Sequence, residues 1–312
     1  MSHSVVIYFD MPGAMDYPFS ERIYYESYRN FSAEAAKSDI AITIARGDSY
    51  RGSMQFSNGW QFVDGELTAV ATPIQADLIY NKSQFGALVS DPNDLVINPP
   101  AFDDIARNKW TSYQALREFC PITYQINNGN WREVFDKIPT NRVVLKPELG
   151  FGGTGIHVAI KSELDFPKLG LTDAYIAQEF IDSSGGIPGI CSGYHDLRIL
   201  LFGGQPKLAF LRQPKAGSLL SNVSQGGTAT AVEISQVPEQ IIASAAAIDQ
   251  RFGAFYPRFY SADFFVQNGR PYLVETNTQP GFPHPDVEGA SFTEQYYGYL
   301  IDIFCQALAA RT

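Results

Sequence analysis

The fold is decided by Lys146-Pro-Glu-Leu-Gly150-Phe-Gly-Gly-Thr-Gly155-Ile-His-Val-Ala-Ile160, in which the glycines match G-x-G-x-x-G literally. After the glycines, β-branched residues stand at every second position, Ile156, Val158 and Ile160, which predicts a strand. A dinucleotide-binding fold instead requires a helix directly after the loop, so that the helix N-terminus meets the pyrophosphate. The stretch therefore predicts a glycine-rich hairpin between two strands.

Two other kinds of glycine loop also disagree with this context. A protein kinase places its lysine after the loop and carries H-R-D and D-F-G motifs, and a Walker loop needs Gly-Lys-Ser/Thr; the sequence has none of these. Here Lys146-Pro147 precedes the loop and ends a strand. Missing side chains let backbone N–H groups approach phosphate oxygens, while the lysine supplies a point charge. Such a hairpin can fold over a triphosphate as a lid, and an ordinary surface lysine on a plain glycine hairpin stays open as the alternative.

A second group of polar residues surrounds the turn at Asn268-Gly269. Glu275 and Asn277 are two apart, so an extended strand presents both on one face. Asp263 joins them if the hairpin pairs it with Glu275, for which we predict an odd loop, Asn268-Gly269-Arg270, with a bulge. Three such oxygen side chains suit a hard cation that bridges phosphates. The alternative is a set of isolated surface acids.

Composition limits the class of protein. The 312 residues, 45% of them apolar, suffice for two ordinary domains or three small lobes. A net charge of -10 opposes the basic surface that nucleic-acid binding requires. No stretch resembles a signal peptide or a membrane span, so we expect a soluble, cytoplasmic protein. The spacing of Cys120, Cys191 and Cys305 supports neither a disulfide framework nor a zinc site.

The N-terminal third predicts a small α/β lobe. Strands are expected at Val5 to Phe9 and Ile40 to Ala45, with a helix from Ser20 to Ser38 between them. A further strand, Ala76 to Tyr80, ends in polar residues of the kind that parallel sheets present to ligands. Turn formers between Asp91 and Pro100 place the first boundary, which gives an N-terminal domain of residues 1–100.

The remainder predicts two further lobes, residues 101–177 and 178–312. Asp103-Asp104 is expected to cap a helix running to about Phe119. From Tyr175 onwards, strands joined by tight turns favour a largely antiparallel sheet. The other expected strands are Ile122 to Ile126, Arg142 to Leu145, Ile156 to Ile160, Tyr175 to Ile181, Asp196 to Phe202, Leu208 to Arg212 and Thr228 to Ile234, and the other helices are Trp131 to Lys137, Pro238 to Phe252 and Phe292 to Ala310.

Five motifs follow one another along the chain. They are Lys146-Pro-x-x-Gly-x-Gly-Gly-x-Gly155-Ile, Gln178-Glu-Phe-Ile181, Asp196-x-Arg198, Ser221-Asn222 and Glu275-x-Asn277. In this order they resemble the ATP-grasp enzymes, especially the branch that contains ribosomal-protein glutamate ligases and glutathione synthetases. The resemblance covers roughly Asp103 to Gly281. It implies an α/β and α+β fold with an N-terminal pre-ATP-grasp lobe, a small lid lobe and a C-terminal antiparallel-sheet lobe.

The resemblance also implies roles for single residues. Lys109 and Lys146 would hold phosphates, and the lid would contain Gly152 and Gly153. The remaining assignments are Gln178, Glu179, Phe180 and Ile181 to adenine, Asp196 to the ribose end, Asn222 to phosphates, and Asp263, Glu275 and Asn277 to magnesium or manganese.

The implied reaction joins a small carboxylic acid to an amine, such as an amino acid or peptide. The carboxylate attacks the γ-phosphate of ATP, and the amine then displaces phosphate from the acyl phosphate. Arg198 and Arg212 are candidates for holding the carboxylate and the tetrahedral intermediate, with a structural salt bridge to Asp196 or Glu233 as the alternative. An ATP-grasp kinase acting on a hydroxyl and a non-catalytic ATP-binding regulator stay open. Such enzymes are often dimers or tetramers, which leaves a homodimer open.

Some positions depart from the family pattern. Leu219-Leu220 and Ser224-Gln225 stand where relatives often carry basic residues, and Tyr260-Ser-Ala262 precedes the metal aspartate where a glycine-hydrophobic pair is usual. These departures concern substrate handling more than ATP binding. Tyr17 and Lys82 are expected to border the substrate, whereas His157 and His195 are interpreted as structural.

Overall fold

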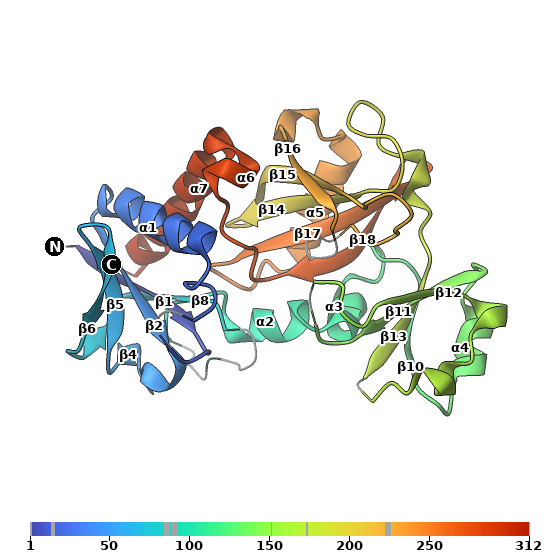
Figure 1. Cartoon of the computed structure of the whole chain (residues 1–312), viewed down its shortest axis with the longest axis horizontal. Coiled ribbons are helices and arrows are strands. Elements are labelled where there is room, and N and C mark those ends of the chain that lie inside the picture. Colours follow the sequence, from blue (N-terminus) through green and yellow to red (C-terminus); the bar gives the residue numbers. More distant parts are fainter. Residues whose placement is uncertain are drawn as a thin grey trace. The chain divides into compact units, whose positions relative to one another are not determined.

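The computed structural model describes residues 2–311 except 14–15, 84–87, 89–90, 92, 151, 173 and 222–225. The chain forms two compact units, whose elements are labelled in Figure 1. Unit 1 comprises Met1–Asp103, Ala254–Phe259 and Gln279–Thr312, and unit 2 comprises Asp104–Gly253 and Tyr260–Thr278. Residues 279–312 thus belong to the unit that contains the N-terminus, whereas the sequence assigned them to the C-terminal lobe.

Unit 1 is built on a six-stranded sheet with the strand order β6-β5-β2-β1-β8-β9. The strands β1 (His3–Phe9), β2 (Ile40–Arg46), β8 (Leu78–Asn81) and β9 (Val96–Ile97) run parallel. Their near-continuous burial is typical of parallel strands that are covered on both faces. The helices α1 (Arg22–Ala36) and α7 (Ala290–Ala309) contact each other through Phe31 and Phe304, and Tyr80 of β8 packs on Phe304.

Residues 47–75 add short strands that the sequence did not predict. The main sheet is extended by β5 (Gly59–Val63), which pairs antiparallel with β2, and by β6 (Glu66–Val70), which pairs antiparallel with β5. A separate three-stranded sheet consists of β3 (Tyr50–Gly52), β4 (Gln55–Phe56) and β7 (Ile74–Gln75). The turn η1 (Gly47–Ser49) and the short helix α6 (Pro285–Glu288) complete the described elements that lie wholly in unit 1.

The helix predicted from Asp103 to about Phe119 is wrong in its extent and its cap. Two helices are present, α2 (Pro100–Ala106) and α3 (Lys109–Leu116). Asn108 between them has an extended backbone, and its side-chain oxygen accepts hydrogen bonds from the amides of Trp110 and Thr111. An asparagine in this position satisfies amides that a helix leaves unpaired at its start. Asn108 therefore restarts the helix, and Lys109 becomes the first residue of α3.

The small lobe of unit 2 is a four-stranded antiparallel sheet with the strand order β10-β13-β11-β12 and the helix α4 (Trp131–Lys137). Its strands are β10 (Thr123–Ile126), β11 (Arg142–Pro147), β12 (His157–Ile160) and β13 (Tyr175–Glu179). Val143, Leu145 and Ala177 form its core with residues of α4. The strand predicted after the glycine loop is confirmed as β12. The predicted boundary between residues 177 and 178 falls inside β13.

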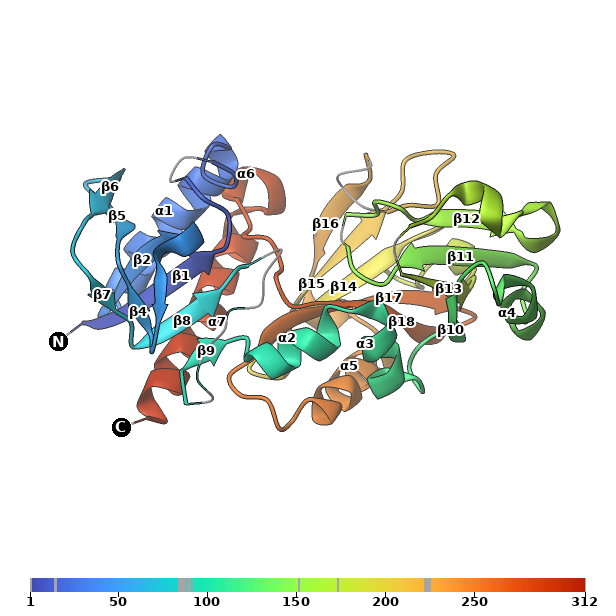
Figure 2. The same cartoon turned by 90° about the horizontal axis from the view of Figure 1, so that it is seen from below.

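The large lobe of unit 2 contains a five-stranded sheet with the order β16-β15-β14-β17-β18. The buried side chains of Ile241, Ala245 and Ile248 lie along α5 (Glu239–Arg251), which runs along this sheet in Figure 2. The strands are β14 (Asp196–Phe202), β15 (Gln205–Gln213), β16 (Thr228–Val232), β17 (Phe259–Gln267) and β18 (Arg270–Asn277). Short 3-10 turns of unit 2 are η2 (Lys161–Glu163), η3 (Phe166–Leu169), η4 (Ser183–Gly185) and η6 (Ile234–Gln236).

The hairpin of β17 and β18 pairs Asp263 with Glu275, as predicted, but it does so by another route. The expected odd loop is wrong, because Gln267 pairs with Arg270 across the two-residue turn Asn268–Gly269, where φ is 52° and 81°. Two positive φ values are what a tight hairpin turn of this length requires. A bulge shifts the pairing by one residue. Phe264 pairs with Leu273 and Asp263 pairs with Glu275, which leaves Val274 as the extra residue.

Among the helices of the described residues, none combines the length and the apolar character needed to cross a bilayer.

Candidate active site

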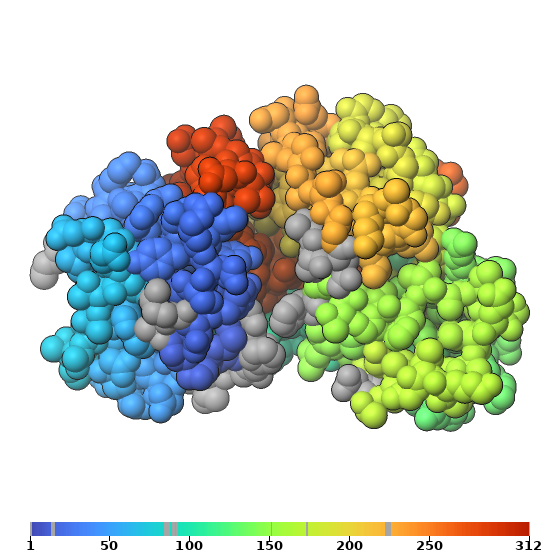
Figure 3. All heavy atoms as spheres, in the orientation of Figure 1, coloured from blue at the N-terminus to red at the C-terminus, as the bar shows by residue number. Residues whose placement is uncertain are grey.

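An open cavity, with about 870 Å³ of empty space that includes solvent at its mouth, lies within unit 2. In Figure 3, atoms of the small lobe (yellow-green) lie next to those of the β15–β16 part of the large sheet (yellow to orange). Among the predicted site residues, those that line the cavity are Lys109, Lys146, Gly153, Gln178, Glu179, Phe180, Ile181, Asp196, Arg212, Asp263 and Glu275. Within the described chain, Gly152, Arg198 and Asn277 are not part of the lining, and Asn222 lies outside the described residues.

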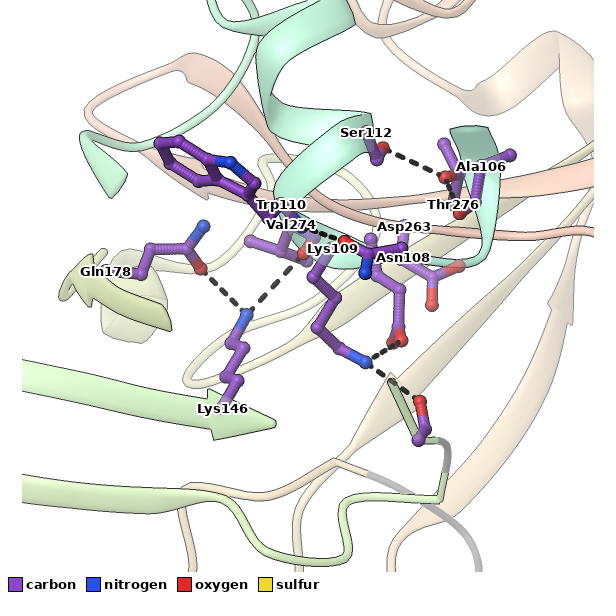
Figure 4. A network of polar contacts seen from close by, with 12 residues as sticks. Ala106, Asn108, Lys109, Trp110, Ser112, Lys146, Gln178, Asp263, Val274 and Thr276 are labelled. Carbon is purple, nitrogen blue, oxygen red and sulfur yellow. Dashed lines mark hydrogen bonds and ion pairs between the residues drawn. The ribbon is translucent and has the colours of Figure 1, made fainter. Parts of the chain in front are cut away.

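Lys146 projects from β11 into the cavity and is only 8% exposed. Its ammonium group donates to Gln178 Oε1 at 2.7 Å and to the carbonyl of the bulged residue Val274 at 3.5 Å (Figure 4). Gln178 is held in turn by its amide, which donates to Thr123 Oγ1 at 3.0 Å. Burial lowers the pKa of Lys146 to about 8, against the opposing effect of the nearby Glu275. Because the hydrogen-bond partners of this ammonium group are neutral oxygens, its positive charge is available to an anion.

Lys109 reaches the same cavity from the start of α3. Its ammonium group lies 3.1 Å from Glu275 Oε1 and donates to the carbonyl of Gly150 at 2.8 Å. Figure 4 shows that the Lys109 and Lys146 side chains approach β18 from different elements. The first residue of the glycine loop is thus connected through Lys109 to one of the predicted metal ligands.

Two arginines and two aspartates form a compact ion cluster on the large sheet. Arg198 binds Asp263 with two parallel bonds, Nε to Oδ1 at 2.7 Å and Nη2 to Oδ2 at 2.6 Å. Arg212 donates to Asp263 Oδ2 at 2.5 Å and also to Asp196, its cross-strand partner. The structural salt bridge between Arg212 and Asp196, an alternative raised by the sequence, is therefore present. Arg198 pairs with Asp263, a partner that the sequence did not suggest.

Burial and charge act in opposite directions within this cluster. Burial raises the pKa of Asp196 to about 6, and Asp263 adds to this while Arg212 counteracts it. For Asp263, burial also opposes ionisation, but Arg198 and Arg212 together lower its pKa below the usual value. In the described structure, Asp196 Oδ1 and Arg212 Nε are buried without a hydrogen-bond partner. A buried acceptor and a buried donor that both lie unsatisfied in a cavity wall suggest a site completed by a polar ligand.

Apolar side chains also line the cavity. They are aliphatic and aromatic residues from both lobes, namely Val144, Ile156, Val158, Phe180, Ile181 and Phe265. An apolar lining of this kind suits a flat heterocycle such as a purine base. Glu179 also lines the cavity, and its carboxylate accepts a hydrogen bond from the backbone amide of Ile122 at 3.3 Å. Its predicted contact with adenine stays a prediction.

The glycine loop requires its glycines, because φ is positive at Gly150, Gly152, Gly153 and Gly155. Gly155 ends the loop, and its carbonyl accepts a hydrogen bond from the Tyr175 hydroxyl at 3.1 Å. A Cβ at Gly155 would lie 2.9 Å from that hydroxyl oxygen. Both the backbone conformation and the contact with Tyr175 therefore require glycine at position 155, where the loop meets β12.

Gly155→Ala is expected to destabilise unit 2 more than Gly170→Ala, the matched control. Both positions have positive φ, 74° and 63°, but a Cβ at Gly170 meets nothing within 4 Å. The backbone strain should cost about 1–2 kcal/mol in each variant, and crowding against Tyr175 should add about 1–3 kcal/mol at Gly155. Urea unfolding followed by tryptophan fluorescence measures both. Equal losses would show that the Tyr175 contact does not constrain the loop.

Several other residues bear on the sequence predictions. His195 accepts from the amide of Val266 at Nε2, 3.2 Å away, while its Nδ1 lies 3.1 Å from the carbonyl of Gly193, which agrees with a structural histidine. All three cysteines are free. Lys82 is buried with its ammonium group on the carbonyl of Pro280, and Tyr17 is 45% exposed; contacts of either with a substrate stay a prediction.

Asn108 and Glu148 were not predicted from the sequence. Asn108 precedes an apolar run and is a preferred helix-capping residue, which could have located the start of α3. Glu148 gave no such signal, because its partners come from distant parts of the chain.

Comparison with known proteins identifies the fold family. Residues 112–256 match the family described as prokaryotic glutathione synthetase, ATP-grasp domain. This segment, a little under half of the chain, is similar in sequence to an ATP-grasp domain. The match ends before β17 and β18, the strands that bring Asp263 and Glu275 to the cavity.

The sequence of this region is similar to those of several ligases. A probable alpha-L-glutamate ligase of Halorhodospira halophila (strain DSM 244 / SL1) is 30% identical over 143 residues, 45% of this chain and 43% of the relative. A glutathione synthetase of Parasynechococcus marenigrum (strain WH8102) is 35% identical over 117 residues, 36% of each chain. The chain therefore spans less than half of the length of either relative.

The fold similarity extends further than the sequence similarity. A D-alanine–D-alanine ligase from Bacillus anthracis, solved in complex with ATP, aligns over 99% of this chain and 98% of its own with a TM-score of 0.62 and 14% identity. The predicted ATP-grasp architecture is thereby confirmed.

Proposed function

We propose that this ATP-grasp chain is an ADP-forming ligase that joins a small carboxylic acid to an amine through an acyl phosphate. One observation carries the proposal: a single cavity is lined by apolar side chains, the buried ammonium group of Lys146 with neutral partners, the glycine loop and the paired acids Asp263 and Glu275. Such a cavity offers a place for a purine, a positive charge for phosphates and oxygen ligands for a cation. The relatives named glutamate ligase and glutathione synthetase support the same class of reaction.

The chemistry requires positioning and charge neutralisation. A substrate carboxylate oxygen attacks the γ-phosphorus, the bond to ADP breaks, and the amine then attacks the acyl carbon and releases inorganic phosphate. Lys146 and Lys109 would offset phosphate charge, and the loop at Gly150 to Gly155 would exclude water from the acyl phosphate. Arg212 lines the cavity and would hold the carboxylate and the oxyanion of the tetrahedral intermediate, with Arg198 orienting Asp263 beside it.

The acidic residues fit a magnesium or manganese ion in their chemistry. Magnesium commonly uses one or two carboxylates together with phosphates and water rather than a complete cage of protein ligands. Within the described chain no three His, Cys, Asp or Glu residues form a cluster, but Asp263 and Glu275 are cross-strand partners that both line the cavity. We therefore propose that these two residues, with Asn277, would hold the ion. When bound, it would neutralise phosphate charge and lower the repulsion met by the attacking carboxylate.

The proposed substrates are small acids and amines, such as amino acids or peptides. A cytoplasmic location and a homodimer stay predictions.

The test is ADP release with MgATP and a panel of amino acids and small acids, supplied singly and in pairs. We expect release to require an acid and an amine together, and hydroxylamine in place of the amine should trap a hydroxamate. Glu275→Gln, which leaves the bonds of Asp263 to Arg198 and Arg212 in place, should abolish both signals. A stable phosphorylated product from a single hydroxyl compound would instead indicate a kinase. Nucleotide binding without turnover in any mixture would indicate a regulator.

A further inference from the structure

Glu148 is a buried carboxylate next to the cavity that the proposed chemistry does not use. It follows Lys146-Pro147 directly, precedes the glycine loop and is 9% exposed. Its two oxygens accept from neutral amides: Oε1 from Gln125 Nε2 at 2.7 Å and Oε2 from Asn108 Nδ2 at 3.2 Å. Both side-chain oxygens therefore act as acceptors from neutral amide groups. Burial of a charge is costly unless hydrogen bonds compensate it, so these amides matter to the site.

The backbone of Glu148 makes two further connections. Its carbonyl accepts from the amide of Lys109 at 2.9 Å, and its own amide donates to the carbonyl of Ala174 at 2.8 Å. Glu148 therefore joins three parts of unit 2, namely the start of α3, the strand β10 through Gln125, and the segment that leads into β13.

These connections meet at Lys109. Asn108 caps α3 with its oxygen, so only its amide group remains to reach Glu148. Lys109 is the next residue, and its ammonium group extends to Gly150 and Glu275. The side-chain bond from Asn108, the backbone bond from Lys109 and the ammonium bond to Gly150 together dock residues 148–150 onto the start of α3.

The other end of the loop has an anchor of its own. The Tyr175 hydroxyl donates to the carbonyl of Gly155. The glycines between these two anchors line the cavity at Gly150 and Gly153. Loss of the contact between Glu148 and Asn108 would therefore move the start of the loop and the Lys109 ammonium group together.

We propose that Glu148 is a positioning residue that, through Asn108, sets Lys109 and the first residue of the glycine loop for binding nucleotide phosphates. The inference rests on the proposed use of this cavity for ATP, but not on the ligase reaction. It assigns to Glu148 no contact with the nucleotide.

The test exchanges the charged and neutral partners. Asn108→Asp keeps the helix cap, because aspartate caps as well as asparagine does, but it sets two carboxylates against each other at the 3.2 Å contact. Glu148→Gln alone can retain its bonds if the exposed Gln125 amide turns over. In the double variant, the introduced glutamine donates to the introduced aspartate and accepts from Gln125, which restores every bond. Asn127→Asp, at an exposed turn where the side-chain oxygen also accepts a backbone amide, is the matched control.

The measurements are the dissociation constant of MgATP by calorimetry and the midpoint of thermal unfolding. We expect Asn108→Asp to weaken MgATP binding by roughly 10-fold to 100-fold, the usual range for breaking a buried hydrogen bond to a charged group. Glu148→Gln, the double variant and Asn127→Asp should stay within about threefold of the unmodified chain, since their bonds are kept. A double variant that binds as weakly as Asn108→Asp, or an Asn108→Asp variant that binds normally, would overturn the proposal.

Turnover separates this inference from the proposed function. If the predicted pattern of dissociation constants appears without ADP release in any substrate mixture, the positioning role stands and the ligase proposal fails. Where turnover is found, the KM for ATP should rise in Asn108→Asp while the KM for the carboxylic acid stays unchanged. A general loss of structure would raise both constants, and that outcome would count against a specific positioning role.

Discussion

Replacing Arg212 by methionine is expected to lower the free energy of unfolding of unit 2 by about 3 to 5 kcal/mol, the range measured when one partner of a buried ion pair is removed. Arg212 is 6% exposed and donates to both Asp196 and Asp263. Asp263 would keep its two bonds to Arg198, but among the described residues the Asp196 carboxylate has no other side-chain hydrogen-bond donor than Arg212. Urea unfolding at pH 7.5 measures the loss.

The control for Arg212→Met is Arg251→Met, which removes an exposed ion pair with Glu118 in the same unit. We expect a loss below about 1 kcal/mol there. The cost of Arg212→Met should also shrink as the pH falls. Without the guanidinium group, the pKa of Asp196 should rise above its value of about 6, so the carboxyl becomes neutral and tolerates burial at lower pH. A cost that is small at pH 7.5, or that grows on acidification, would contradict this description of the cluster.

Replacing Lys146 by methionine should lower kcat/KM for ATP by roughly 100-fold to 1,000-fold, as does the loss of one hydrogen-bond donor that stabilises a transition state. The Lys146 ammonium group is buried and bound to neutral oxygens, so it is ready to meet an anion. Steady-state ADP release measures the effect. Lys137→Met, which breaks an exposed i,i+4 pair with Glu133, is the control and should leave kcat/KM unchanged. Equal activity of the two variants would remove Lys146 from the phosphate site.

The Lys146 variant should remain folded, which distinguishes it from Arg212→Met. Burial holds the pKa of Lys146 at about 8, below the usual lysine value of 10.5. The unfolded chain therefore binds more protons between these two pH values, and the stability of the nucleotide-free protein should rise with pH across that window. The penalty for the buried ammonium group is fully present below about pH 8. Lys146→Met should lose this part of the pH dependence, as unfolding curves at pH 7.5 and 9.5 would show.

Local patterns in the sequence were sufficient for most of unit 2. The alternation after Gly155 predicted β12, and the spacing of Glu275 and Asn277 with the turn at Asn268 predicted the pairing of Asp263 with Glu275. The ordered motifs predicted the ATP-grasp fold. The first two inferences succeeded because each depends on residues close in sequence or on strands joined by a short turn, whereas the third rests on the order of motifs along the chain.

Two kinds of feature could not be predicted in this way, namely the choice between two hairpin geometries of equal effect and the contacts between residues far apart in the sequence. A two-residue turn with a bulge at Val274 is present in place of the expected odd loop. Both geometries pair Asp263 with Glu275, so the pairing alone does not distinguish them. The helix expected to continue past Asp103 breaks at Asn108, whose amide bonds Glu148, forty residues away. The pairing of Arg198 with Asp263 likewise joins two strands far apart in the sequence. The metal and nucleotide roles of these residues stay predictions.

The most direct test of the acyl-phosphate ligase is isotope transfer from the acid. Any acid and amine pair that supports ADP release would be supplied with ¹⁸O in both carboxylate oxygens, and the inorganic phosphate would be examined by ³¹P NMR. Because the carboxylate attacks phosphorus and its oxygen leaves with phosphate, one ¹⁸O should appear in each phosphate released, and the amide should keep the other. Unlabelled phosphate, with both labelled oxygens still in the acid, would contradict the account.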